Sequence, residues 1–99
     1  MKVFISQPMR DKSDEEILAE RNRAIGEIKA RFPTENIEVI DSFFRVSDHD
    51  NSPLHFLGKS IQLLGKADLV YFCKDWHLYR GCRVEYKVAM EYEKQIISK

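Results

Sequence analysis

The residue in this sequence whose position most suggests chemistry is Glu85. It lies in the first turns of an expected helix that opens at Gly81. The apolar residues on the same helix face are Val84, Val88 and Ala89, and this face must pack on the rest of the fold. A carboxylate so close to a helix N-terminus is favoured in its ionised form. An acidic residue on the solvent face would complement the helix dipole equally well. The position of Glu85 on the apolar face therefore indicates function as readily as structure.

Two thiols flank the same region. Cys73 is expected inside a buried strand and Cys82 near the helix start, where the pKa of a thiol can be lowered. A thiol nucleophile would need a base, and His77 is the only nearby candidate. We favour two structural thiols, since two cysteines nine residues apart fit neither a metal site nor a disulfide framework.

A second group of polar residues has metal-ligand chemistry but no recognised spacing. It consists of Asp48, His49 and Asp50, with Asp41 and His55 nearby in the sequence. A solvated loop is the preferred interpretation, and we predict no metal and no cofactor. A loop of this length in a small domain is nevertheless often functional.

The elements that must position these residues alternate regularly along the chain. Strands are predicted at residues 2–6, 37–41, 68–73 and 95–98, and helices at residues 13–32, 53–65 and 81–94. Ser13 and Glu16 form a capping box at the start of the first helix, and Ser52 with Pro53 starts the second. Leu54, Leu57, Ile61 and Leu64 form an apolar seam that we expect to pack on the sheet.

This alternation predicts an α/β fold, a flavodoxin-like three-layer sandwich with a four-stranded parallel sheet of strand order 2-1-3-4. Residues 1–99 should form a single domain. The switch point lies between the first and third strands, where ligands of such sheets collect at the carboxyl ends. We therefore expect a site between the loops 6–9 and 74–76, with Glu85 as its floor.

Composition excludes some partner classes. The 99 residues include sixteen basic and sixteen acidic side chains, so the net charge is +0 and nothing favours a nucleic acid polymer or an anionic membrane. No apolar run reaches the length of a membrane span, and the N-terminus lacks a signal-peptide core. We expect a cytoplasmic protein.

Nearly the whole chain resembles the nucleoside 2-deoxyribosyltransferase-like family, which includes 2'-deoxynucleoside 5'-phosphate N-hydrolases. The matching features are the opening Val3-Phe-Ile-Ser-Gln-Pro-Met9, Ala67-Asp68 before an apolar strand, and Gly81-Cys-Arg-Val-Glu85 followed by Ala89. The chain differs from the family at two positions. Phe4 stands where a tyrosine that contacts the nucleophile is common, and Asp11 stands where glycine is frequent.

The resemblance implies cleavage or transfer of the N-glycosidic bond of a 2'-deoxynucleoside or its 5'-monophosphate. It implies Glu85 as the nucleophile and Asp68 as an assisting acid. A homo-oligomer, a dimer at least, is also expected. A nucleotide-binding or sensing module without turnover is the alternative, and Phe4 favours it. The residues expected to bind the substrate are Ser6, Gln7, Pro8, Met9, Arg10, Asp41, Phe43, Trp76 and Gly81. Among them, Arg10 is proposed to bind a 5'-phosphate, and Trp76 or Phe43 is proposed to stack on the base.

Overall fold

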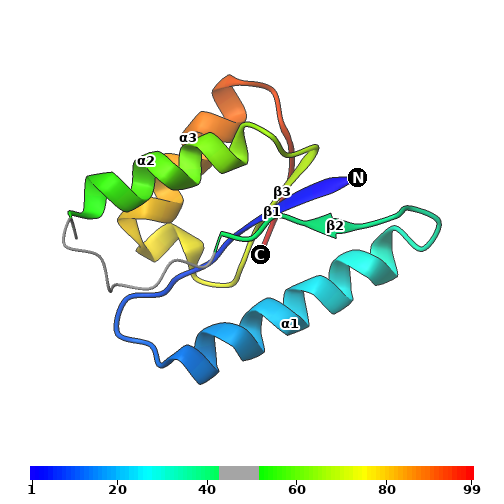
Figure 1. The fold of residues 1–99 in the computed structure, drawn as a ribbon, viewed down its shortest axis with the longest axis horizontal. Coiled ribbons are helices and arrows are strands. Elements are labelled where there is room, and N and C mark those ends of the chain that lie inside the picture. The colour runs from blue at the N-terminus through cyan, green and yellow to red at the C-terminus, as the bar shows by residue number, and fades with distance from the viewer. Residues whose placement is uncertain (43–51) are drawn as a thin grey trace.

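The computed structural model describes residues 1–42 and 52–99. Within these ranges the chain forms one parallel sheet with the strand order β2-β1-β3-β4 (Figure 1). The strands are β1 (Lys2–Ser6), β2 (Glu38–Val39), β3 (Leu69–Phe72) and β4 (Gln95–Ser98). The predicted strand order and the flavodoxin-like α/β class are therefore confirmed.

Three α-helices and one 3-10 helix connect the strands in the described ranges. They are α1 (Asp14–Arg31), α2 (Pro53–Leu64), the 3-10 helix η1 (Trp76–Leu78) and α3 (Arg80–Glu91). The capping box of α1 is confirmed, because the Ser13 hydroxyl accepts from the Glu16 amide and the Glu16 carboxylate accepts from the Ser13 amide. No helix among the described residues combines the length and the apolar character needed to cross a bilayer.

The helices cover the two faces of the sheet, with α1 on one side and α2 and α3 on the other (Figure 1). Strand alternation explains this division. Val3 and Ile5 of β1 point to the cluster that contains Ala24 and Ile28 of α1, whereas Phe4 points to the opposite cluster. Ser6 follows Phe4 by two residues and so belongs to the α2 and α3 face, where its hydroxyl meets Glu85.

Strand β2 is shorter than the predicted span 37–41. Its ladder with β1 covers Glu38 and Val39, and the Ile40 amide still donates to the Val3 carbonyl. The Ile40 carbonyl then leaves the sheet, because Nη2 of the buried Arg21 donates to it at 2.7 Å. A side chain from α1 thus ends the edge strand. The guanidinium of Arg21 is therefore directed at the backbone of the edge strand and not at bulk water.

Helix α2 packs less completely than its apolar seam predicted. It lies against α3, and of its residues only Leu64 at its C-terminal end is buried, whereas Leu54 at its N-terminal end is 77% exposed. The N-terminal half of the helix therefore leaves apolar surface uncovered in this single chain.

Candidate active site

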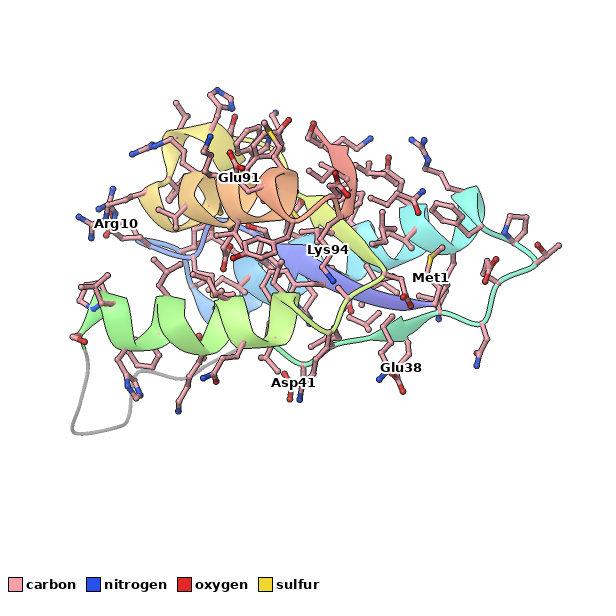
Figure 2. All side chains as sticks on the ribbon, turned by 90° about the horizontal axis from the view of Figure 1, so that it is seen from above. Met1, Arg10, Glu38, Asp41, Glu91 and Lys94 are labelled. Carbon is pink, nitrogen blue, oxygen red and sulfur yellow. The ribbon has the colours of Figure 1, made fainter. Side chains whose placement is uncertain are left out.

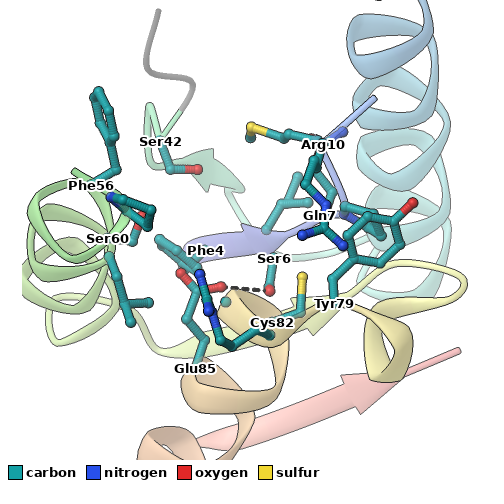
Figure 3. A pocket seen from close by; sticks show the side chains of 17 residues that line it. Phe4, Ser6, Gln7, Arg10, Ser42, Phe56, Ser60, Tyr79, Cys82 and Glu85 are labelled. Atoms are coloured by element: carbon teal, nitrogen blue, oxygen red, sulfur yellow. Dashed lines mark hydrogen bonds between the residues drawn. The ribbon is translucent and has the colours of Figure 1, made fainter. Parts of the chain in front are cut away.

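The predicted carboxyl-end crevice contains an open pocket of about 410 Å³. The end of β1 and its following loop form one wall, α2 forms a second, and the start of α3 forms the third (Figure 3). Ser42, from the segment after β2, completes the lining. The lining residues therefore come from segments far apart in sequence, which the parallel sheet brings together at one edge.

Glu85 lies on the floor of this pocket. Its side chain comes from the second turn of α3, is only 7% exposed, and accepts a hydrogen bond at Oε1 from the Ser6 hydroxyl at 2.7 Å (Figure 3). Burial raises the pKa of Glu85 from 4.5 to about 7, and the hydroxyls of Ser6 and Ser60 oppose that increase. A buried carboxylate with a pKa near neutrality is typical of groups that take part in catalysis.

The pocket has two chemically different ends on either side of Glu85. Pro53, Phe56 and Leu57 of α2 supply an apolar and aromatic surface at one end. Arg10 and Tyr79 lie at the other, with the guanidinium carbon of Arg10 6.0 Å from the centre of the Tyr79 ring. Figure 3 shows Phe56 and Arg10 on opposite sides of the Glu85 carboxylate.

The N-terminus of α3 adds to the second end. Its N-cap residue, Tyr79, provides no side-chain hydrogen bond, and the first turn contains no acidic residue. Arg80, Gly81 and Cys82 line the pocket at this point. A Cβ atom added at Gly81 would meet nothing within 4 Å, so neither backbone nor packing requires glycine there. The start of α3 therefore borders the pocket at the end of a helix whose first amides have no partner within the helix, and helix N-termini of this kind can bind anions.

Seven of the sequence-predicted site residues come together in this pocket. They are Ser6, Gln7, Pro8, Met9, Arg10, Gly81 and Glu85. The Gln7 side chain is buried, its Nε2 donates to the Ile17 carbonyl at 2.9 Å, and its Oε1 has no partner among the described residues. The loop after β1 thus lines the crevice as predicted.

Asp68 does not belong to this site. Its backbone and carboxylate both bond to Lys2, at the amino end of β1, whereas Ser6 and Glu85 lie at the carboxyl end. Ser6 is four steps along the strand from Lys2, a distance of about 13 Å. Figure 2 shows the same polarity, with Met1 and Arg10 at opposite ends of the molecule. Asp68 fixes the register of β1 against β3, and the expectation that it assists Glu85 is corrected.

Two other predicted contacts lie elsewhere, and one cannot be located. Trp76 of η1 stacks on Tyr86, with ring centres 4.4 Å apart, and does not line the pocket. Asp41 is exposed and does not line it either, although its neighbour Ser42 does. Phe43 lies outside the described residues. The loop after β3 reaches the pocket only through its last residues, since Lys74 and Asp75 line a separate cleft beside α1.

Sequence reasoning missed the wall formed by α2. Phe56 and Ser60 lie one helical turn apart, and Pro53 and Leu57 extend the same surface. A signal was present, because Ser60 follows Phe56 by four residues and so places a hydroxyl on the same helix face as an aromatic ring. The seam was instead assigned to the sheet, and Tyr79 and Ser42 had no distinguishing pattern.

The alternative chemistries receive no support from the geometry. Burial raises the pKa of Cys82 to about 11 and that of Cys73 to about 12, so both thiols stay protonated near neutrality. His77, the base that a thiol would need, does not line the pocket. The described ranges contain no group of three metal-ligating side chains, and Asp48, His49 and Asp50 lie outside them.

Comparisons with known proteins found no match of significance. No family model matches the chain, and neither a curated protein nor a solved structure is significantly similar to it.

Proposed function

We propose that this protein cleaves or transfers the N-glycosidic bond of a 2'-deoxynucleoside or its 5'-monophosphate, with Glu85 as the nucleophile. The observation that carries the proposal is the Glu85 carboxylate itself. It is buried on the floor of an open pocket at the carboxyl ends of parallel strands, with a pKa of about 7. The family resemblance of the sequence gives the same residue the same role.

The reaction would proceed in two steps. The ionised carboxylate attacks the anomeric carbon of the sugar as the base departs, which gives a glycosyl ester, as in retaining glycosidases. Water or a second base then releases the sugar, and this choice decides between a hydrolase and a transferase. Raising the pKa of a carboxylate increases its basicity, so the ionised form of Glu85 would be a stronger nucleophile than an exposed glutamate.

The two ends of the pocket orient such a substrate. The base would lie against Phe56 and Leu57, where an aromatic ring offers a stacking surface. The 5' side of the sugar would point toward Arg10 and the N-terminus of α3, which together suit a phosphate. This arrangement places the sugar over Glu85 and assigns stacking to Phe56 in place of Trp76.

A binding or sensing module without turnover is the second candidate. The observation in its favour is Phe4, which lines the pocket with a ring that has no hydroxyl where the resembled family has a tyrosine. Stabilisation by nucleotides without release of base would support this function over catalysis.

We also propose that the chain forms a homo-oligomer. Leu54 is 77% exposed, Tyr92 is 76% exposed and Met90 is 50% exposed, so α2 and α3 leave large apolar side chains uncovered. A second copy packed on α2 would cover part of this surface beside the pocket. Light scattering at micromolar concentration tests the assembly, and a monomeric mass would refute it.

Trapping the covalent intermediate tests the proposed chemistry. The protein is mixed with 2'-deoxynucleosides and their 5'-monophosphates, quenched in acid, and its intact mass is measured. We expect a deoxyribosyl adduct on Glu85 with at least one substrate and no adduct on Glu85→Gln. Turnover by the wild type without any adduct, together with turnover by Glu85→Gln, would exclude a glutamate nucleophile.

A further inference from the structure

The Glu85 carboxylate depends on one neighbouring strand residue for its direct hydrogen bond. Ser6 is 2% exposed, and its hydroxyl lies 2.7 Å from Oε1 of Glu85 across a separation of 79 residues in sequence. Phe4 faces the same side of β1 but has no hydroxyl. Ser6 is therefore the residue of β1 whose side chain can donate to this carboxylate.

The direction of this hydrogen bond determines which oxygen is left for chemistry. An ionised carboxylate has no proton, so the Ser6 hydroxyl must be the donor and Oε1 the acceptor. Among the described residues Ser6 makes the close hydrogen bond to this carboxylate, and the Ser60 hydroxyl lowers the pKa of Glu85 by less, so Oε2 is the oxygen that Ser6 leaves open. Because both side chains are buried, the bond holds the carboxylate plane in one orientation.

We propose that Ser6 is a positioning residue that holds Oε1 of Glu85 and thereby selects Oε2 as the attacking oxygen. This inference rests on the proposed function, because it assigns a role in that reaction. In the attack, a lone pair of Oε2 forms the bond to the anomeric carbon. The bond from that carbon to the base nitrogen breaks, and the base leaves with the bonding electrons and takes its proton from water. Oε1 becomes the ester carbonyl oxygen and still accepts from Ser6, whose proton does not move.

The other groups around Glu85 do not duplicate this contact. The Ser60 hydroxyl of α2 lowers the pKa of Glu85 by less than the Ser6 hydroxyl does. The Cys82 thiol is protonated, because burial raises its pKa to about 11. Arg10, Arg80 and Tyr79 line the same pocket, but none contributes to the pKa of Glu85. Removing the Ser6 hydroxyl should therefore change both the ionisation and the orientation of the carboxylate.

An NMR titration measures the ionisation directly and does not require turnover. The side-chain carboxyl carbon of Glu85 is followed in protein labelled with ¹³C-glutamate, in the wild type, Ser6→Ala, Ser6→Thr and Ser42→Ala. We expect Ser6→Ala to raise the pKa of Glu85 by about one unit or more, since a hydrogen bond to the ionised form is lost. Ser6→Thr keeps a hydroxyl and should restore the wild-type pKa. Ser42→Ala removes a pocket hydroxyl without a bond to Glu85 and should leave that pKa unchanged.

Kinetics test the positioning role separately. If the wild type releases base, Ser6→Ala should lower kcat by about 10- to 100-fold with little change in KM. The acid limb of its pH profile should shift upward with the pKa measured by NMR, and Ser6→Thr should recover most of kcat. If Ser6→Ala does not fold, Ser6→Cys replaces it, and its weaker donor should give an upward shift of the same sign.

The outcomes separate this inference from the proposed function. An unchanged pKa of Glu85 in folded Ser6→Ala overturns the inference, whether or not the wild type is active. A raised pKa with normal kcat in Ser6→Ala overturns it too, since orientation would then not matter. If Ser6→Ala raises the pKa of Glu85 but the wild type releases no base, the hydrogen bond from Ser6 to Glu85 is supported. The proposed function is then refuted instead.

Discussion

Replacing Glu85 by glutamine should make the protein more stable at alkaline pH. The pKa of this carboxyl is about 7 in the folded chain and 4.5 as its ordinary value. A group whose pKa is raised by folding contributes stability that is complete below pH 4.5 and is lost as the pH rises through 7. The difference of 2.5 units corresponds to a loss of ~3 kcal/mol, at about 1.36 kcal/mol per unit. Glutamine has the same shape, can accept from Ser6 and carries no charge to bury.

The assay is urea denaturation of the wild type and Glu85→Gln at pH 4.5 and pH 8.5. Between these values the wild type should lose ~3 kcal/mol of unfolding free energy relative to the variant, because every other titrating group is common to both. Glu91→Gln is a matched control in the same helix. Glu91 is exposed, and its pKa is lowered by Lys87, so any difference should be small and of opposite sign. Parallel pH dependences for wild type and Glu85→Gln would refute the claim that folding buries this carboxylate at a cost.

Three further predictions concern other residues. Arg10→Ala should reduce any preference for monophosphates over nucleosides by ~1–3 kcal/mol, as measured by calorimetry, while leaving nucleoside binding nearly unchanged. Equal weakening of the binding of both ligands would show that Arg10 does not bind a phosphate. Arg21→Met keeps an unbranched apolar stem but leaves the Ile40 carbonyl without its donor, so it should lower the unfolding free energy by ~1–3 kcal/mol in urea. Unchanged stability would contradict the role given to Arg21. Asp11 has a φ of 63°, so Asp11→Gly should raise the thermal midpoint by relieving ~1 kcal/mol of backbone strain, whereas a lower midpoint would show that the aspartate side chain stabilises the turn.

The fold was predictable because each element has its own local pattern. The apolar strands β1 and β3, the capping box of α1 and the Ser52-Pro53 start of α2 all lie where the sequence placed them. Strand order then followed from the alternation of strands and helices. The bounds of β2 were not predictable, because they depend on Arg21 reaching the edge strand from a different element.

The site was predictable only in part. The loop after β1 and Glu85 could be placed at the same edge, since both follow from the polarity of a parallel sheet. The same polarity argues against Asp68, which precedes β3 and so must lie at the other end. The family resemblance suggested a role that this geometry does not allow. The sequence puts Phe56 and Ser60 on one face of α2, but that this face borders the pocket depends on how α2 packs on α3.

The most direct test of the central claim is release of base. Wild-type protein, Glu85→Ala and Glu85→Gln are incubated with a panel of 2'-deoxynucleosides and their 5'-monophosphates, and the free base is measured by chromatography. The buried carboxylate predicts release from at least one substrate by the wild type, and a loss of several orders of magnitude in both variants, because neither replacement can act as a nucleophile. A Glu85→Ala variant that retains most of the wild-type rate, or a wild type that releases no base from any substrate, would contradict the account.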